Sequence, residues 1–422
     1  MDRSPGSTAS TFFRQLIQSR DITQQLVNHD QEIKVAIIDD DFHFALQSDG
    51  GEKLHVKLHD GMFTLSLGPC SDESVTLVAP EAEWQKFFSP LPPPPYQSFW
   101  GMLRVLGHDG RIRVGGDPAS FAKNARVWRL VLDKMKQVFN DKNTGPPNTN
   151  LEEEPEVDAV VGRYVWINSE YFGKCKMFVE SSGNGQQALL LLHTAGADSR
   201  QYHSIMNDKE LQKRTTMFAF DMPGHGRSYP GHKMIISQLG IKDCIVSGAS
   251  MAGHVCLAVA LRATELGVVG VIPCEACDYV SSSGTLYGIA SSNNESVMNA
   301  EIVSGLSGPS TLPAHQKMIW WGYSSQAAGI FAGDLCFYFE GWDGRDRVAS
   351  IDTTICPVYM LTGEYDYSCT PAASRATAAK IPGAVFTEMK GMGHFPAAED
   401  PSGFLPHLFR GLDFIQNASV KR

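Results

Sequence analysis

The chain has no long apolar run, no excess of basic residues and no apolar core near its N-terminus. None of its apolar segments reaches the roughly 18–20 residues that a membrane-spanning helix needs. The net charge of −10, from 46 acidic and 36 basic residues, argues against a general nucleic-acid or anionic-membrane binder. The start of the chain does not resemble a signal peptide, and its last three residues are not a peroxisomal signal. We therefore expect a cytoplasmic protein without a membrane span.

The cysteines show neither disulfide nor metal-site spacing. There are nine, an odd number, and several lie in apolar runs, as reduced buried thiols do. Cys274 and Cys277 form a CxxC pair, but no second pair or histidine cluster stands near it in the sequence. We expect no metal site. The apolar fraction of 43% in 422 residues is enough for a core in each of two or three domains.

A linker divides the chain. Residues 141–158 are rich in Pro, Gly, Asn and acidic residues and lack hydrophobic periodicity, which predicts a linker between residues 1–140 and 159–422. In the first part, short alternating runs between residues 32 and 79 are typical of an antiparallel sheet with one solvated face. From Pro118 onward, apolar residues recur every three or four positions and predict a helix. We expect an α+β domain with its helices packed on a sheet.

This order of elements resembles the sterol-carrier-protein-like fold. The resemblance covers roughly residues 12–139 and includes the strand–GGDP–helix segment at Gly115–Pro118. That family implies an apolar tunnel for lipid-like ligands. The same Phe and Trp residues would also form an ordinary core, so both interpretations stay open.

The second part of the chain has a different pattern. Its strand-like runs are short, almost continuously apolar, and end in small or polar residues: ALLLLH, TMFAFD, DCIVSG, VGVIPC and PVYMLTG. Strands that are buried on both faces have this composition, which predicts a parallel sheet covered by helices. In such sheets the chemistry gathers at the carboxyl ends of the strands.

Ser250 follows one of these runs directly. It lies in Gly248–Gly253, between the strand-like DCIVS and the helix-like HVCLAVALRATEL. A serine on such a strand-to-helix turn presents its hydroxyl at the sheet edge, and small residues two positions before and after it let backbone and helix approach closely. Gly248 and Ala252 meet that need. The sequence therefore predicts Ser250 as a nucleophile.

A serine nucleophile needs a base, and the base needs an acid. His394 follows the last strand-like run, in a glycine-rich loop, and Asp366 lies just past PVYML. The order Ser, acid, His is the one found in α/β-hydrolases. Glu275, at the end of the preceding strand, is an alternative acid, and Glu364 is a third option.

Two backbone N–H groups are expected to stabilise the oxyanion. One is that of Met251, next to the nucleophile at the start of the helix. The other should come from the turn His193–Gly196 after ALLLLH. We predict Ala195 as this second donor.

With HTAG, FDMPGHGRS, GASMAG, TGEYD and GMGHFP in this order, residues from about 161 to 422 resemble a serine α/β-hydrolase. Thr194 and Ala252 depart from the glycines usual in that family. The resemblance implies acyl transfer to Ser250 and hydrolysis by water activated through His394, with no metal and no organic cofactor. The Ser-Met pair and the late GHFP resemble the branch of C–C bond hydrolases, lactonases and biosynthetic esterases or thioesterases, which would fit a role in secondary metabolism.

A cap is expected between the strands that end near residue 278 and begin near residue 357, at about residues 279–345, because this interval is too long for one crossover helix. The cap is rich in aromatic residues. Aromatic side chains over a serine site suggest a medium-sized apolar or aromatic substrate, although they could equally pack the cap onto the body. The expected pocket residues are Thr194, Trp320, Trp321, Tyr323 and Phe337.

The sequence thus predicts a doubly wound α/β-hydrolase domain with a cap, preceded by a smaller α+β domain. Its predicted activity is hydrolysis of an ester, thioester, lactone or activated C–C bond in a medium-sized apolar or aromatic molecule. The alternatives are a protein that binds apolar ligands with an inactive hydrolase body, and a cofactor-free lyase or cyclase. Only about 22 residues separate Ser228 from Ser250, which predicts a stunted crossover helix. Either a partner chain, such as a second copy of this chain, or the N-terminal domain could cover its exposed flank.

Overall fold

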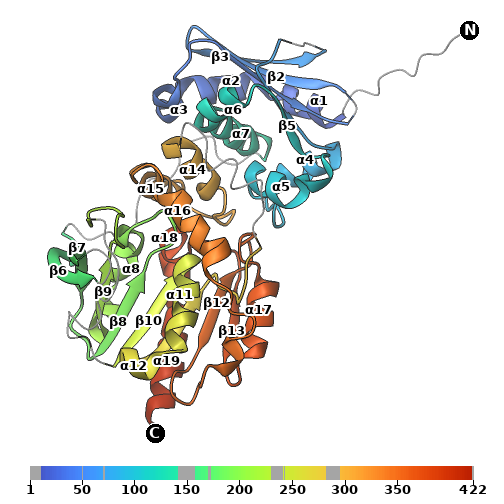
Figure 1. Cartoon of the computed structure of the whole chain (residues 1–422). Coiled ribbons are helices and arrows are strands. Elements are labelled where there is room, and N and C mark those ends of the chain that lie inside the picture. Colours follow the sequence, from blue (N-terminus) through green and yellow to red (C-terminus); the bar gives the residue numbers. More distant parts are fainter. Residues whose placement is uncertain are drawn as a thin grey trace, which may run out of the picture. The chain divides into compact units, whose positions relative to one another are not determined.

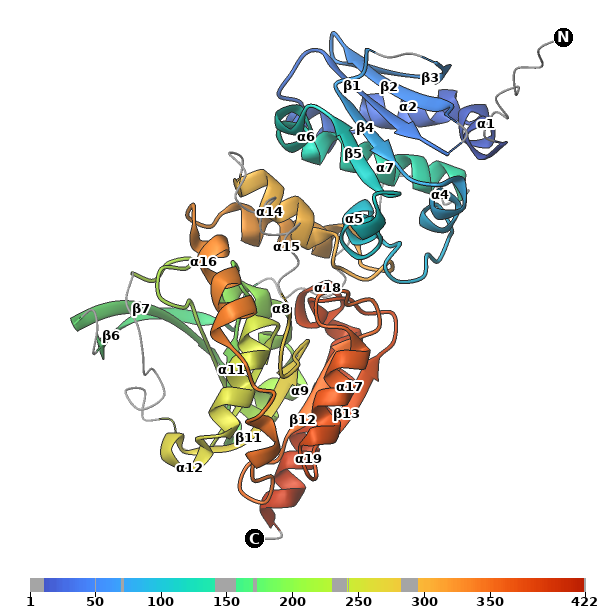
Figure 2. The same ribbon diagram turned by 45° about the vertical axis from the view of Figure 1, so that its right-hand side comes forward.

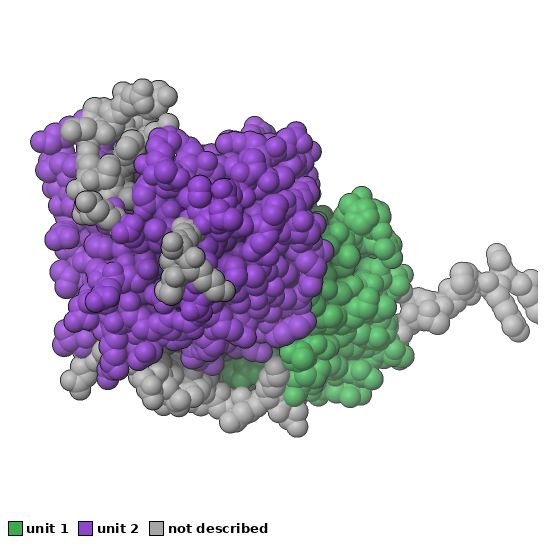
Figure 3. Space-filling view, turned by 90° about the horizontal axis from the view of Figure 1, so that it is seen from below, with its two compact units in different colours: residues 1–149, 292–305 green, residues 150–291, 306–422 purple. Residues whose placement is uncertain are grey.

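The structure, a computed structural model, describes residues 11–49, 51–69, 72–140, 157–169, 173–229, 241, 243–281 and 295–420. The chain divides into two compact units, which are coloured separately in Figure 3: residues 1–149 with 292–305, and residues 150–291 with 306–422. All but the last two residues of the predicted linker, and most of the segment predicted as a stunted helix, lie outside the described residues.

The first unit is a five-stranded sheet with helices packed on one face (Figures 1 and 2). Its strands, in the order β3-β2-β1-β4-β5, are β1 (Phe42–Gln47), β2 (Lys53–His59), β3 (Met62–Gly68), β4 (Val75–Val78) and β5 (Arg113–Gly116). Its helices are α1 (Thr11–Gln18), α2 (Arg20–His29), α3 (Gln31–Ala36), α4 (Glu81–Phe87), α5 (Phe99–Leu106), α6 (Pro118–Lys123), α7 (Ala125–Phe139) and α14 (Glu295–Ser304), with a 3-10 turn, η1 (Gly107–Asp109).

The sheet of the first unit is mixed, and the prediction of an antiparallel sheet was wrong for one pair of strands. β1 pairs with β4 in parallel, and the other described pairs are antiparallel. The reason is that the chain leaves the edge strand β3 and returns past β2 to place β4 beside β1. Alternation along β1 and β2 directs one set of side chains into the core, where they are fully buried: Phe44, Leu46, Leu54 and Val56.

Helix α14 belongs to this first unit, although it comes from the middle of the segment predicted as a cap. It packs against α7 and α6. The buried carboxylate of Glu301 on α14 accepts hydrogen bonds from Arg126 Nη1 at 2.9 Å and from Arg129 Nε. Two arginines on α7 therefore hold the inserted helix through one carboxylate.

Replacing Glu301 with alanine is expected to lower the free energy of unfolding by about 3 kcal/mol, because it removes the fully buried carboxylate that Arg126 and Arg129 share. Each arginine keeps one more exposed partner, Glu32 or Asp133. The measurement is urea unfolding followed by circular dichroism. Asp133→Ala is the matched control. Asp133 also pairs with Arg129, but its side chain is 45% exposed, so its removal should cost under about 1 kcal/mol. Equal losses for the two variants would contradict this account.

The second unit is built on an eight-stranded sheet in the order β13-β12-β11-β10-β8-β9-β7-β6 (Figure 1). Its strands are β6 (Val161–Ser169), β7 (Gly173–Ser182), β8 (Gln187–Leu192), β9 (Thr215–Phe220), β10 (Cys244–Ala249), β11 (Val268–Cys274), β12 (Tyr359–Gly363) and β13 (Val385–Met389). Neighbouring strands from β13 through β9 in this order pair in parallel. β7 pairs antiparallel with both of its neighbours, β9 and β6. The apolar runs of the sequence are the parallel strands, as expected.

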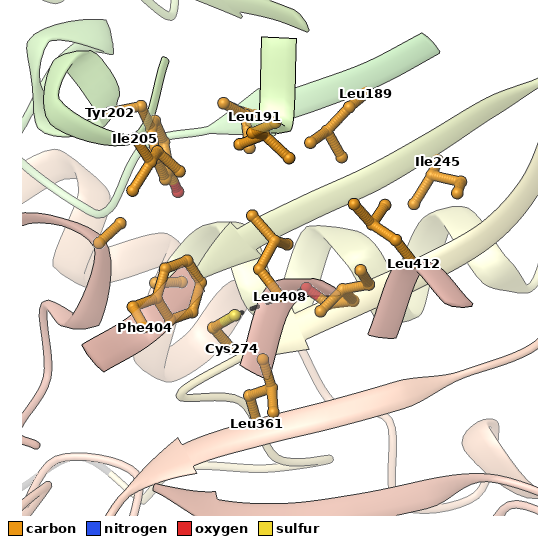
Figure 4. Packing of buried hydrophobic residues seen from close by; sticks show 14 of the residues in the cluster. Leu189, Leu191, Tyr202, Ile205, Ile245, Cys274, Leu361, Phe404, Leu408 and Leu412 are labelled. Atoms are coloured by element: carbon orange, nitrogen blue, oxygen red, sulfur yellow. Dashed lines mark hydrogen bonds between the residues drawn. The ribbon is translucent and has the colours of Figure 1, made fainter. Parts of the chain in front are cut away.

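Helices cover both faces of this sheet. α8 (His203–Met206), α9 (Lys209–Arg214) and α19 (Pro401–Val420) supply apolar side chains to the cluster on one face, of which Leu408 and Leu412 are seen between strand residues in Figure 4. α11 (Met251–Ala260), α12 (Ala263–Leu266) and α17 (Pro371–Lys380) supply the cluster on the other face. Burial on both faces explains why these strands are continuously apolar.

The remaining elements of this unit lie at the carboxyl ends of the strands or in their connections: η2 (Ser199–Tyr202), α15 (Pro313–Ser324), α16 (Ile330–Cys336), the π-helical turn η3 (Phe337–Gly341), η4 (Val348–Ser350) and α18 (Pro396–Glu399). The predicted cap therefore consists, within this unit, mainly of α15, α16 and η3. Of the helices that the structure describes, none has both the length and the apolar character needed to cross a membrane.

Candidate active site

Ser250 lies on a strained turn between β10 and α11. Its backbone has φ +60° and ψ −121°, a conformation that costs a non-glycine residue on the order of 1–3 kcal/mol. The turn depends on small neighbours. A Cβ at Gly248 would come within 2.7 Å of the Ala252 Cβ, and one at Gly253 would come within 2.3 Å of the Cys274 carbonyl oxygen. The strand and the helix therefore fix the serine at the sheet edge, as the sequence suggests.

His394 and Asp366 are joined by a hydrogen bond. Asp366 follows β12 and His394 follows β13, and the neighbouring strands place them together. His394 Nδ1 lies 2.8 Å from Asp366 Oδ2, and both side chains are buried. Asp366 Oδ1 accepts backbone N–H groups from Ser368 at 2.7 Å and Cys369 at 3.2 Å. This carboxylate can hold the proton of His394 on Nδ1 and leave Nε2 as the basic nitrogen.

Ser250 lies at the same edge of the sheet as this pair. β10 is followed in the sheet by β11, β12 and β13, whose carboxyl ends carry the predicted acid and base. His254, whose N–H donates to the Ser250 carbonyl at 3.1 Å, is close enough to His394 to respond to its charge: burial, assisted by that charge, lowers the pKa of His254 to about 3. Among the described side chains, no hydrogen bond joins Ser250 Oγ to His394.

Among the described residues, the alternative acids form no hydrogen bond with His394. Glu275 is fully buried at the end of β11, and its carboxyl group accepts the Gly363 N–H at 3.3 Å. Burial, together with the nearby carboxylates Asp366 and Glu399, raises the pKa of Glu275 well above its ordinary value. Glu364 bonds instead to Lys390 and to the backbone of residue 391. Asp366 is thus the acid that the structure pairs with His394.

In the turn after β8, one backbone N–H group, that of Ala195, has no acceptor among the described residues. Thr194 N–H donates to Gln201 Oε1 at 3.0 Å, and Gly196 N–H donates to Asp334 Oδ2 at 2.7 Å. Within the described part of the chain, the N–H of Ala195 has no acceptor, and neither has that of Met251 at the start of α11. The strand order reverses between β8 and β10, the position where ligands bind in sheets of this kind.

Two buried residues that support the site were missed from the sequence. His193 Nδ1 lies 2.8 Å from the Thr194 carbonyl oxygen, and its Nε2 accepts the Met222 N–H at 2.9 Å. Burial and the neighbouring His225 lower the pKa of His193 to about 4, so this neutral ring stabilises the turn through its two hydrogen bonds. No sequence pattern distinguishes a histidine with this role from an ordinary core histidine.

The second missed residue is Glu399, on α18. Its buried carboxyl group accepts the Gly308 N–H at 2.9 Å and the N–H of Gly393, which precedes His394. The His394 N–H in turn donates to the Leu306 carbonyl at 3.1 Å. Burial raises the pKa of Glu399 to about 8. Glu399 therefore ties the histidine loop to the start of the cap.

A cavity of about 270 Å³ lies beside this site, between η2, α8, α15 and α18. Two predicted pocket residues, Trp321 and Tyr323, line it. Thr194 reaches its wall indirectly, because its Oγ1 lies 2.6 Å from the Tyr323 hydroxyl. Trp320 and Phe337 are absent from the described wall, and Phe337 is 40% exposed. Ser250 and His394 do not line this cavity either, but Phe395, which follows His394 in the chain, and Ala197, two positions after Ala195, do.

The geometry defines an α/β-hydrolase fold with a serine, a histidine–aspartate pair and free backbone donors at one edge of the sheet. A family model described as "Alpha/beta hydrolase family" matches residues 189–406, just over half of the 422 residues. The chain belongs to the alpha/beta hydrolase family.

Several known proteins are similar to this chain at low sequence identity. An uncharacterized protein of Mycobacterium tuberculosis is 23% identical over 275 residues, which cover 56% of this chain and 78% of the relative. A thermophilic esterase from Thermogutta terrifontis has a TM-score of 0.53 and 20% identity, and the match covers 60% of this chain and 99% of the esterase. The enol-lactonase from Burkholderia xenovorans LB400 has a TM-score of 0.50 and 19% identity, over 59% of this chain and the whole lactonase. At these identities the solved structures establish the fold alone.

Proposed function

We propose that this chain is a serine hydrolase that cleaves an ester, thioester, lactone or activated C–C bond through an acyl-enzyme on Ser250. The observation that carries the proposal is the 2.8 Å hydrogen bond between His394 and Asp366 at the sheet edge where Ser250 occupies its strained turn. A buried imidazole with its Nδ1 proton held by a carboxylate is prepared to accept a proton on Nε2.

The reaction would proceed in two steps. Ser250 Oγ attacks the carbonyl carbon while His394 Nε2 takes the hydroxyl proton, and the oxyanion forms against the N–H groups of Met251 and Ala195. The leaving group departs with the proton from His394, and the acyl group remains on Ser250. Water, activated by the same nitrogen, then releases the acid and restores the serine. Each oxyanion donor would supply about 10²–10³-fold in rate, and the contact between Ser250 and His394 would tighten when substrate binds.

The substrate we propose is a medium-sized apolar or aromatic molecule. The cavity beside the site supports this, because Trp321, Tyr323, Phe395, Met318 and Ile319 contribute to its wall. The printed names of an esterase and an enol-lactonase among proteins of similar fold fit the same range of carbonyl chemistry.

Product analysis in ¹⁸O-labelled water tests this proposal against a lyase or cyclase on the same scaffold. A panel of aryl esters, thioesters and lactones is incubated with the full-length protein, and the acid products are examined by mass spectrometry. Hydrolysis must place one heavy oxygen in each acid. Turnover without incorporation of label would favour the lyase or cyclase, and binding of apolar ligands without any turnover would favour a ligand-binding protein.

A further inference from the structure

A buried polar cluster lies on the far face of the sheet of the first unit. In the pairing of β1 with β2, His43 lies opposite Lys57 and His55 lies opposite Ala45. His43 and His55 are therefore diagonal neighbours on the face that points away from the apolar core. The sequence predicts a solvated face here, yet His43 is 9% exposed and His55 is 1% exposed. Two buried imidazoles on a polar face require an explanation.

The outer nitrogens of the two rings have different surroundings. His55 Nε2 lies 2.9 Å from the Gly68 carbonyl oxygen, which favours the proton on this nitrogen. His43 Nδ1 is buried and lies 3.2 Å from a carboxylate oxygen of Asp72, but it forms no hydrogen bond among the described residues.

The inner nitrogens of the two rings face each other. His43 Nε2 and His55 Nδ1 are 3.0 Å apart. A neutral His43 with its proton on Nε2 would donate a hydrogen bond to His55 Nδ1 and leave its own Nδ1 unpaired. A metal ion bound by both inner nitrogens would instead place the His43 proton on Nδ1, which faces Asp72. Carboxylate and carbonyl groups that orient histidine ligands in this way are a regular feature of metal sites.

Glu73 distinguishes the two explanations. It lies on the segment between β3 and β4, and its side chain is 7% exposed. Its Oε1 accepts hydrogen bonds from Thr76 Oγ1 at 3.2 Å and from Lys53 Nζ, whereas its buried Oε2 has no hydrogen-bond partner among the described residues. Ligand atoms of His43, His55 and Glu73 lie within 4.8 Å of one another. A hydrogen bond between two neutral histidines would leave this carboxylate oxygen and His43 Nδ1 without partners, whereas a metal ion would use all three groups.

We propose that His43, His55 and Glu73 form a binding site for a zinc-like divalent cation in the first unit. Two imidazoles and one carboxylate are a ligand set that suits zinc, and a fourth position would remain for water. The spacing of 3.0 Å between the inner nitrogens is close to the value of about 3.3 Å that tetrahedral zinc with bonds of 2.0–2.1 Å requires. Small rotations of the side chains would complete the site, and the cation would compete with Lys53 for Glu73. The sequence analysis found no metal site because these residues become neighbours only through strand pairing.

Zinc binding by the full-length protein tests this site. Protein treated with a chelator is dialysed against micromolar zinc at pH 7.4, and the retained metal is measured by mass spectrometry. We expect one zinc per chain for the wild type and a loss of this zinc in the double variant His43→Gln/His55→Gln. His59→Gln is the matched control, because His59 lies on β2 with His55 but has a side chain that is 74% exposed. This variant should retain the zinc.

A second variant guards against misfolding. Glu73→Gln keeps the volume of the side chain and can still bond to Thr76, so its circular dichroism spectrum should match the wild type while zinc binding weakens by roughly tenfold or more. Zinc content that is equal in the wild type and a folded double variant would place the metal elsewhere. Absence of bound zinc in the wild type, or unchanged affinity in Glu73→Gln, would overturn the proposal.

Discussion

Ser250→Ala is expected to lower kcat by about 10⁵–10⁶-fold, which leaves only the catalysis that the oxyanion donors and substrate binding supply. The substitution removes the atom that would carry the acyl group. Because no described residue accepts a hydrogen bond from Ser250 Oγ, the free energy of unfolding should change by less than about 1 kcal/mol. The measurements are steady-state hydrolysis of an aryl ester and urea unfolding of the same preparations.

Ser247→Ala is the matched control for this prediction. Ser247 lies on the same strand and is also buried, but its hydroxyl donates to the Ile272 carbonyl at 3.0 Å. Its loss should cost roughly 1 kcal/mol of stability and leave kcat within a few-fold of the wild type. A folded Ser250→Ala protein that hydrolyses its substrate at the wild-type rate would exclude Ser250 as the nucleophile.

Asp366→Asn is expected to lower kcat by about 10³–10⁴-fold without unfolding the protein. The N–H groups of Ser368 and Cys369 would retain the amide oxygen at the present position of Asp366 Oδ1. The amide NH₂ would then face His394 Nδ1 and force the ring proton onto Nε2. In that tautomer His394 cannot take the serine proton, so the loss should appear in kcat rather than in KM.

Glu275→Gln separates the two candidate acids. Since burial raises the pKa of Glu275 well above its ordinary value, the neutral amide closely resembles the form that the folded protein already contains. We expect its kcat to stay within about tenfold of the wild type. If Glu275→Gln abolished turnover and Asp366→Asn did not, the assignment of the acid would be reversed.

Much of the second unit could be predicted from the sequence, because its strands carry a strong local signal. Runs such as Gln187–Leu192 and Cys244–Ala249 are apolar on both faces, and Ser250 follows one of them directly. The strands β6 and β7 were not identified. Val161, Tyr164 and Trp166 on β6 are between 48% and 64% exposed, so this strand lacks the burial pattern that identified the others.

Interactions between distant segments could not be predicted. Glu399 joins the loop of His394 to residue 308, 91 positions away, because its carboxyl group accepts the backbone N–H groups of both segments. The local sequence around Glu399 describes only a short helix. Glu301 similarly joins α14 to α7, across 172 positions from Arg129. Such contacts depend on how the chain returns to itself, which hydrophobic periodicity does not encode.

The first unit shows the same limit. Alternation of apolar and polar residues predicted its strands, except at residues 32–39. This run was expected as a strand, but it begins with helix α3, whose first turn the Asp30 side chain caps. Alternation also could not indicate that part of the polar face would be buried around His43 and His55. The resemblance of this unit to the sterol-carrier-protein-like fold, with the tunnel which that family implies, stays a prediction.

The most direct test of the proposed chemistry is to locate a covalent adduct. The full-length protein is treated with a fluorophosphonate, digested, and mapped by tandem mass spectrometry, with Ser250→Ala treated in parallel. The proposed mechanism predicts one phosphonyl group on Ser250 in the wild type, none in the variant, and loss of esterase activity in step with labelling. Complete inactivation with the label on a different residue, or an unlabelled Ser250 in a protein that still hydrolyses esters, would contradict it.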